Sequence, residues 1–220
     1  MIRAVVFDVG ECLVDESRIF GEWADWLGVP RHTFSAVFGA VIAAGQDHRR
    51  AFEILRPGID LAVEREKRLA AGQPEGFGED DLYPDVRPAL TALRAAGLWV
   101  GIAGNQPVRA GFDLRALDLP TDMIGTSEDW GVSKPDIAFF HAVAGAVPFP
   151  PEQTLYVGDR LENDVLPAGA AGFRTALIRR GPWAFIHQDD PRATLDTTMR
   201  IDSLTELPGR IAAFDNAGTG

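Results

Sequence analysis

Polar side chains follow, or lie near the end of, four separate apolar stretches of this 220-residue chain. They are, in chain order, Asp8, Asn105 after Gly104, Lys134, and the pair Asp159 and Asp164. Removing a charged group from water at the end of a buried strand is costly unless the charge is paired or bound to a metal. In an open parallel α/β sheet, ligands bind just beyond the carboxyl ends of the strands. The four groups therefore predict one site at that edge of such a sheet.

The acidic members of this set are suited to a hard cation. Asp159 and Asp164 flank an expected strand-to-helix turn, and their spacing can bring both carboxylates to one point. Together with Asp8 they form an acidic cluster of the kind that binds Mg²⁺. Lys134 would balance the carboxylates and could hold a phosphate oxygen. By themselves, Asp159 and Asp164 are better explained as a solvated helix start, where the helix dipole favours aspartate.

Alternating strands and helices are expected to carry these residues. Short apolar runs predict strands at residues 4–7, 98–103, 123–126, 154–157 and 174–178. Helices are expected at residues 84–96, 109–117 and 137–146, from residue 163, and in a short C-terminal helix after residues 201–207. Such alternation implies parallel strands joined by right-handed crossovers. We therefore predict an α/β fold with a Rossmann-like three-layer core around a parallel sheet.

Residues 14–82 differ from the rest of the chain because their apolar residues recur at helical spacing. Helical segments are expected around residues 20–27, 34–42, 47–55 and 60–71, with Ser17 as a candidate cap of the first. In the last segment we expect charges on one side and Leu61, Leu69 and Ala70 on the other. Trp23 and Trp26, three residues apart, are interpreted as part of the core of this bundle. The sequence thus predicts an α/β core of residues 1–13 and 83–220 with a helical insertion of residues 14–82.

The composition limits the partners of the chain. Its formal net charge of -11, without a basic stripe, disfavours nucleic acid. No apolar stretch reaches the length of a membrane span. A single cysteine, Cys12, excludes a disulfide framework and favours a reducing compartment. Because the first residues are expected to enter a strand directly, we expect no signal peptide. We expect a cytoplasmic monomer or homodimer.

The order of the motifs resembles that of the haloacid dehalogenase (HAD) superfamily. The motifs are Asp8, Gly104-Asn105, Lys134-Pro135, and Gly158-Asp159 followed by Asp164. The resemblance covers the whole chain, and the helical insertion after the first motif is similar to the C1 cap of subfamily I. The resemblance implies a Mg²⁺-dependent phosphatase that acts on a small phosphorylated metabolite. Asp8 would attack phosphorus and become an aspartyl-phosphate.

The resemblance also implies the other site residues. Mg²⁺ would be held by Asp8, by the backbone carbonyl of Gly10 and by Asp159, with Asp164 supporting the metal or Lys134. The transferring phosphoryl group would be bound by Lys134 and by Asn105, with backbone N–H groups near Gly104. A cation and a metal ion are the charge stabilisers that phosphoryl transfer mainly needs.

Two glycines depart from the family pattern. The aspartate that usually serves as general acid/base, two residues after the nucleophile, is Gly10 here, and the usual Ser or Thr of the second motif is Gly104. Without a positioned acid an alcohol departs poorly. We therefore expect acyl, aryl or anomeric sugar phosphates to be better substrates than simple alkyl phosphates. Glu11 could replace the missing acid only if the turn after the strand re-aims its side chain. Cys12 has no neighbouring base that would make it a nucleophile.

Two other functions stay open at this point. A 2-haloacid dehalogenase also uses an Asp nucleophile and lacks the second Asp, but it needs no metal and usually carries a Tyr at the position of Gly10. The retained Asp159 and Asp164 argue against it. A non-catalytic HAD-like binding or regulatory protein would explain the glycines at positions 10 and 104. The intact acidic cluster and Lys134 argue against that function, because such charges are costly to keep without use.

Overall fold

In a computed structural model that describes residues 1–217, the chain forms two compact units. One unit comprises Met1–Asp15 and the chain from Gly78 onward, and the other comprises Glu16–Phe77. The sequence placed these boundaries at residues 13/14 and 82/83. They lie elsewhere because Val14 forms bridges to Gly10 and Leu82, and the Asp15 amide donates to the Asp81 carbonyl at 2.8 Å.

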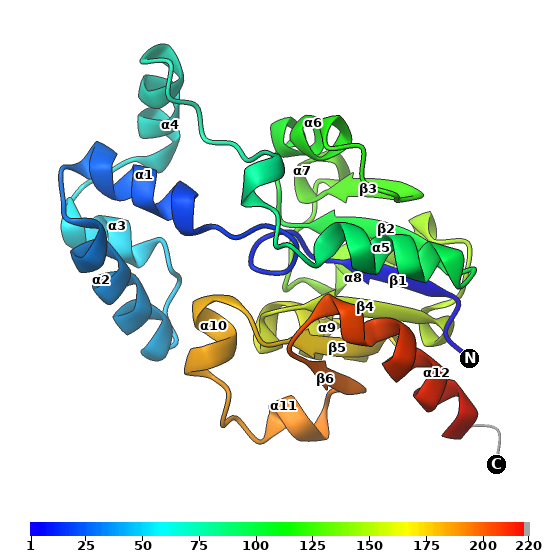
Figure 1. Cartoon of the computed structure of the whole chain (residues 1–220). Coiled ribbons are helices and arrows are strands. Elements are labelled where there is room, and N and C mark those ends of the chain that lie inside the picture. The colour runs from blue at the N-terminus through cyan, green and yellow to red at the C-terminus, as the bar shows by residue number, and fades with distance from the viewer. Residues whose placement is uncertain (218–220) are drawn as a thin grey trace. The chain divides into compact units, whose positions relative to one another are not determined.

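The first unit is built on a sheet in which all strands are parallel (Figure 1). Over residues 1–217 its strands are β1 (Ala4–Phe7), β2 (Trp99–Gly104), β3 (Met123–Thr126), β4 (Thr154–Gly158), β5 (Arg174–Ile178) and β6 (Met199–Ile201). The spatial order is β3-β2-β1-β4-β5-β6. The order reverses between β1 and β4, and ligands bind at such a switch point, outside the carboxyl ends of the strands.

Helices cover both faces of this sheet. They are α5 (Val86–Ala95), α6 (Val108–Ala116), α7 (Ser127–Trp130), α8 (Ile137–Ala146), α9 (Leu166–Ala170), α10 (Gly181–Ile186), α11 (Arg192–Leu195) and α12 (Leu207–Ala217). In Figure 1, α5 and α12 lie in front of the sheet, and α8 and α9 lie behind it. Phe139 and Phe140 of α8 are buried in one cluster with Val6 and Tyr156. This layering confirms the predicted α/β fold.

The C-terminal third contains elements that the sequence did not predict. Met199–Ile201 forms β6, parallel to β5, where the sequence predicted no sixth strand. Three residues with an exposed Arg200 at the centre are too short for a recognisable strand pattern, and pairing with β5 supplies the hydrogen bonds. The helix expected from residue 163 begins as a π-helical turn over Leu161–Val165 and continues as α9.

The second unit, residues 16–77, is a helical bundle with an aromatic core. Its helices are α1 (Ser17–Leu27), α2 (Arg31–Ala43), α3 (Arg50–Leu55) and α4 (Leu61–Ala70). Trp23 is buried, as predicted, and meets Phe52 edge-on with ring centroids 5.2 Å apart, whereas Trp26 is only partly buried. Phe34 contacts Phe52 in the same way at 5.2 Å. Ser17 is the first residue of α1, and Glu16 occupies the N-cap position, so Ser17 does not cap this helix.

Helix α4 buries residues of its charged side. Glu64 and Arg68 are buried, whereas Leu69 is 56% exposed. The Arg68 guanidinium lies 4.6 Å from the centroid of the Trp23 ring, and Glu64 accepts a hydrogen bond from Trp26 Nε1 at 2.8 Å. The tryptophans of α1 offer a ring face and an indole N–H, so the charged side of α4 finds partners among them. None of the described helices has the length and apolar composition needed to span a membrane.

Candidate active site

Asp8 is the first residue after β1 and lies beside the point where the strand order reverses. Its side chain is buried, and its backbone amide donates to the Val157 carbonyl of β4 at 2.8 Å. The Oδ1 atom of Asp8 is 2.6 Å from Lys134 Nζ. Burial raises the pKa of the Asp8 carboxyl above its ordinary value, and the Lys134 ammonium offsets part of that rise. The carboxylate thus sits where an α/β fold presents groups to a ligand.

Lys134 lies between two carboxylates. Its Nζ is 2.6 Å from Asp8 Oδ1 and 2.6 Å from Asp164 Oδ1. Burial alone would lower the pKa of Lys134, but the charges of Asp164 and Asp8 hold it well above its ordinary value. The side chain is therefore a fixed cation.

Asp8, Asp159 and Asp164 each place one carboxylate oxygen within 4.8 Å of the others. Asp164 is held by Lys134 and by the Arg160 amide, which donates to Oδ2 at 3.0 Å. Both oxygens of Asp159, in contrast, are buried without a hydrogen-bond partner among the described residues.

Burial, together with the charges of Asp164 and Asp8, raises the pKa of the Asp159 carboxyl well above its ordinary value. A buried carboxylate without a donor is costly unless a cation lies beside it. The orphaned oxygens of Asp159 and the oxygen-only donor set therefore fit a hard divalent cation.

Two glycines allow close contacts at this site. A Cβ atom on Gly158 would lie 2.5 Å from Asp164 Cβ, and a Cβ atom on Gly104 would lie 2.6 Å from Asp8 Oδ1. Both distances are shorter than real Cβ contacts. Gly104, which looked like a loss of the hydroxyl found in the family, is thus the residue that leaves room for the Asp8 carboxylate.

The Asn105 side chain is engaged with the backbone of Lys134. Its Nδ2 donates to the Lys134 carbonyl at 2.8 Å, and its Oδ1 accepts from the Lys134 amide at 2.7 Å. The sequence predicted a phosphate ligand here. The two hydrogen bonds hold the loop that carries Lys134 against the end of β2, so this side chain supports the lysine, and its contact with phosphate stays a prediction.

The segment after Asp8 folds back on itself. The amides of Leu13 and Val14 both donate to the Val9 carbonyl at 2.9 Å. Glu11 has a φ of 52°, in the left-handed region, and its buried carboxylate accepts a hydrogen bond from the Tyr83 hydroxyl at 2.6 Å. The turn therefore does re-aim Glu11, and it directs the carboxylate to Tyr83.

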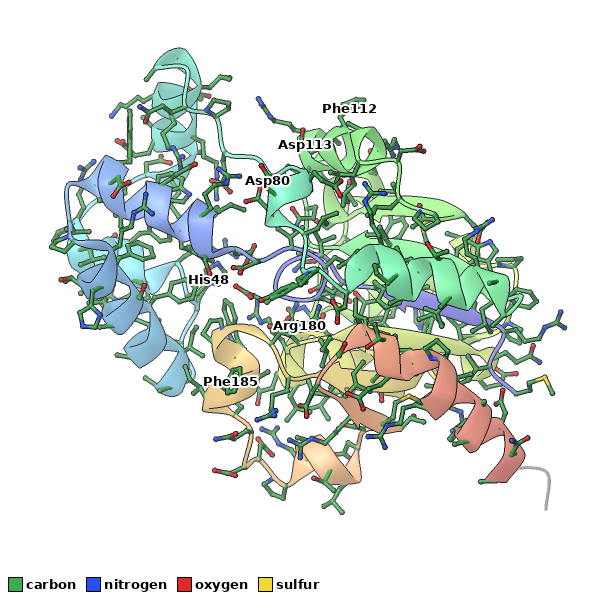
Figure 2. The ribbon with its side chains drawn as sticks, viewed as in Figure 1. His48, Asp80, Phe112, Asp113, Arg180 and Phe185 are labelled. Carbon is green, nitrogen blue, oxygen red and sulfur yellow. The ribbon has the colours of Figure 1, made fainter. Side chains whose placement is uncertain are left out.

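Sequence reasoning missed the residues that hold this segment. Arg180, labelled in Figure 2, donates through Nη1 to the Cys12 carbonyl at 2.9 Å and forms an ion pair with Asp85. Arg180 follows β5 closely, at the same edge of the sheet as Asp8, which is the signal that could have identified it. Burial raises the pKa of the Cys12 thiol well above its ordinary value, and the nearby Asp8 adds to the shift. Cys12 is therefore not a nucleophile.

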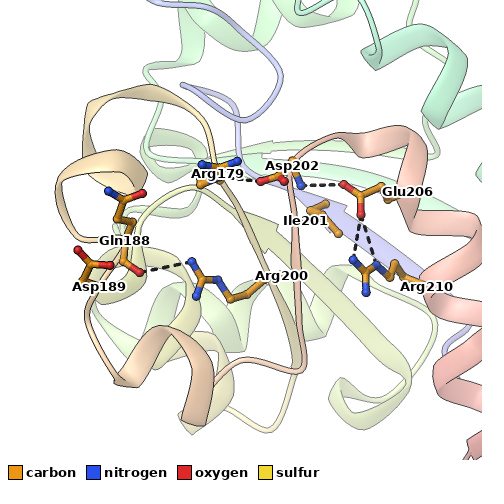
Figure 3. A pocket seen from close by; sticks show the side chains of 8 residues that line it. All are labelled: Arg179, Gln188, Asp189, Arg200, Ile201, Asp202, Glu206 and Arg210. Carbon is orange, nitrogen blue, oxygen red and sulfur yellow. Dashed lines mark hydrogen bonds and ion pairs between the residues drawn. The ribbon is translucent and has the colours of Figure 1, made fainter.

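A separate pocket of about 380 Å³ lies in the same unit (Figure 3). Two of the arginines that line it are paired with acidic residues: Arg179 with Asp202 at 2.7 Å, and Arg210 with Glu206 at 3.1 Å. The third, Arg200, donates to the Gln188 carbonyl at 3.4 Å. None of the residues that line it belongs to the acidic cluster. Within residues 1–217, the candidate site therefore lies at the carboxyl ends of β1, β2 and β4 and in the loop of Lys134.

Comparison with known proteins agrees with this geometry. Residues 2–172 match the haloacid dehalogenase-like hydrolase family. The chain is 29% identical over 209 residues to a glyceraldehyde 3-phosphate phosphatase of Methanopyrus kandleri. The aligned region covers 83% of this chain and 86% of that relative.

Two solved structures share the fold. The magnesium-bound HAD-hydrolase YfnB of Bacillus subtilis has a TM-score of 0.68 at 20% identity, with 94% of this chain and 97% of that chain covered. The L-2-haloacid dehalogenase PA0810 has a TM-score of 0.65 at 22% identity, with 96% and 100% covered. The acidic cluster at the end of β1, the parallel sheet and the family match together establish that this chain belongs to the haloacid dehalogenase-like hydrolases.

Proposed function

We propose that this hydrolase is a Mg²⁺-dependent phosphatase that acts on a small phosphorylated metabolite through an aspartyl-phosphate on Asp8. The observation that carries the proposal is the Asp159 carboxylate, which is buried without a hydrogen-bond donor next to Asp8 and Asp164. A dehalogenase that uses no metal has no need for such a group. The phosphatase relative from Methanopyrus kandleri supports a small phosphate ester as substrate.

The metal ligands would be Asp8, Asp159, the Gly10 carbonyl and Asp164, either directly or through water. When bound, Mg²⁺ would neutralise the charge of the phosphoryl oxygens. Lys134, already a fixed cation, would hold another phosphoryl oxygen while it keeps Asp8 in place.

The reaction then has two displacements. An oxygen of Asp8 attacks phosphorus, the bond from phosphorus to the ester oxygen breaks, and the leaving group departs as its oxyanion. Water then attacks the phosphorus of the aspartyl-phosphate, the bond to the Asp8 oxygen breaks, and the proton that the water loses balances the one that the oxyanion takes up from solvent. Inorganic phosphate leaves, and the Asp8 carboxylate is restored.

Gly10 supplies no proton to the leaving group in the first displacement. Since general acid help is worth about 10²–10⁴ in rate, esters whose leaving group needs no proton are favoured. We therefore retain the preference for acyl, aryl or anomeric sugar phosphates over alkyl phosphates. We also propose that the helical unit of residues 16–77 is the cap that excludes water during catalysis.

The test is a hydrolysis screen with and without Mg²⁺, run on the wild-type chain, on Asp8→Asn and on Asp196→Asn. Asp196 is an exposed aspartate outside the cluster and serves as the matched control. We expect Mg²⁺-dependent phosphate release that disappears only in Asp8→Asn. Halide release from 2-haloacids without metal would overturn the proposal in favour of a dehalogenase. Mg²⁺ binding without turnover of any ester would favour a non-catalytic protein, and alkyl esters turned over faster than aryl esters would refute the substrate preference.

A further inference from the structure

The peptide between Gly10 and Glu11 carries the backbone carbonyl that is proposed as a metal ligand. The N–H of the same peptide, on Glu11, donates to the Val14 carbonyl at 2.8 Å. The N–H and C=O of a trans peptide point in opposite directions. The Gly10 carbonyl is therefore directed away from Val14, and whatever holds this peptide plane also holds the direction of the carbonyl.

Glu11 is the residue that sets this plane. Its φ of 52° is in the left-handed region, which residues other than glycine rarely adopt. The φ angle relates the plane of the Gly10–Glu11 peptide to the direction of the Glu11 side chain. A contact that anchors the end of this side chain therefore opposes rotation of the peptide.

The structure anchors the Glu11 side chain from two directions. The Tyr83 hydroxyl donates to Glu11 Oε2 at 2.6 Å. A Cβ atom on Gly181 would lie 2.5 Å from Glu11 Cγ, so the glycine there leaves the space that the side chain fills. Tyr83 is itself held, because the Arg180 guanidinium lies 4.3 Å from the centroid of its ring while it donates to the Cys12 carbonyl. Burial and the Glu11 carboxylate raise the pKa of Tyr83, so its hydroxyl stays a donor.

We propose that Tyr83 is a positioning residue for the divalent cation: by holding Glu11 in its left-handed conformation, it directs the Gly10 carbonyl toward the acidic cluster. This inference takes from the proposed function only the position at which the cation binds. It concerns binding of the ion and can be tested without any substrate.

The test measures the affinity of the full chain for Mg²⁺ by calorimetry, and for Mn²⁺ by the electron paramagnetic resonance of the free ion. Tyr83→Phe removes one hydroxyl and keeps the ring under Arg180. Loss of a group that orients a metal ligand typically costs about 10- to 100-fold in metal affinity, and we expect a loss in that range. Glu11→Ala removes the acceptor and should weaken binding equally, and the double variant should weaken it no further.

Two further variants separate orientation from charge and from general stability. Glu11→Gln keeps an oxygen that accepts from Tyr83, so its affinity should stay within about 3-fold of wild type, a small change next to the loss expected above. Thr126→Val is the control for the loss of a hydroxyl. The Thr126 hydroxyl, at the end of β3, donates to the Asp129 carboxylate at 2.8 Å. We expect this substitution to lower the melting temperature without changing the affinity for Mg²⁺.

The outcomes distinguish this inference from the proposed function. Equal Mg²⁺ affinity in Tyr83→Phe and wild type overturns the inference, and so does a loss in Glu11→Gln as large as in Glu11→Ala, because the charge would then be the cause. Tight Mg²⁺ binding that depends on Tyr83, in a chain that hydrolyses no ester, upholds the inference and overturns the proposed phosphatase. A wild-type chain that binds neither ion overturns both.

Discussion

Replacing Gly104 with serine would restore the hydroxyl that is common at this position of the family, yet we expect the change to lower activity. The added Cβ would lie 2.6 Å from Asp8 Oδ1 and 3.1 Å from Val9 Cγ2. Ordinary contacts of a Cβ atom begin at 3.4 Å, and distances under 3.0 Å are essentially never seen. Asp8 Oδ1 must therefore move by about 0.4–0.8 Å.

The size of the effect follows from that displacement. Asp8 Oδ1 is held at 2.6 Å by Lys134 Nζ, so the proposed nucleophile cannot move without disturbing the ion pair. A misplacement of 1 Å can cost about 10²-fold in rate. We therefore expect Gly104→Ser to lower kcat/KM by about 10- to 100-fold, which corresponds to about 1.4–2.8 kcal/mol of transition-state stabilisation.

The assay is Mg²⁺-dependent hydrolysis of an aryl phosphate by wild type, Gly104→Ser and Gly145→Ser. Gly145 lies in α8, and a Cβ atom there would meet nothing within 4 Å, so this control should keep wild-type kcat/KM. Equal or higher activity in Gly104→Ser, with Asp8 unmoved in its crystal structure, would refute the steric reasoning.

Three further predictions concern the same site. Burial raises the pKa of the Asp159 carboxyl in the folded chain above its ordinary value of 3.8. Without metal, the free energy of unfolding therefore falls as the pH rises from 3.8 to the raised pKa, because the unfolded chain releases this proton more easily. Asp159→Asn should therefore raise the melting temperature without metal, more at pH 7.5 than at pH 5, and abolish the stabilisation by Mg²⁺; thermal scans that show a lower melting temperature would contradict this. Asn105→Asp replaces the donor to the Lys134 carbonyl with a second acceptor, and kcat/KM should fall by about 10-fold or more while circular dichroism stays unchanged. Undiminished activity would exclude a positioning role for Asn105. Gly158→Ala, whose Cβ would meet Asp164 Cβ at 2.5 Å, should lower the free energy of unfolding in urea by about 1–3 kcal/mol, whereas Gly169→Ala in α9, with its nearest contact at 4.0 Å, should not destabilise. Equal stability of the two variants would show that the sheet edge yields to the new methyl group.

Much of the site could be predicted from the sequence because its residues follow strands. Parallel strands end at one edge of a sheet, so the order of strands and polar residues was enough to bring Asp8, Lys134, Asp159 and Asp164 together. The strands at 4–7, 123–126 and 174–178 were predicted with the bounds that the structure has. Runs of β-branched and aliphatic residues buried on both faces carry this information locally.

Other features depend on contacts between residues far apart in the chain, which no local pattern encodes. The charged side of α4 is buried because the tryptophans of α1 offer it partners. The sequence treated Asn105 as a ligand and Gly104 as a loss. The structure shows that the Asn105 side chain supports the Lys134 backbone through two hydrogen bonds. It also shows that Gly104, without a side chain, leaves space for the Asp8 carboxylate.

Glu11 illustrates the same division. The sequence by itself determined that a carboxylate follows Gly10, shortly after the strand that ends before Asp8. It left the direction of that carboxylate open, since one turn residue can point to either side. The tertiary structure decided it, because Tyr83 and Gly181, which come from distant segments, supply the hydrogen bond and the space that hold Glu11 in a left-handed conformation.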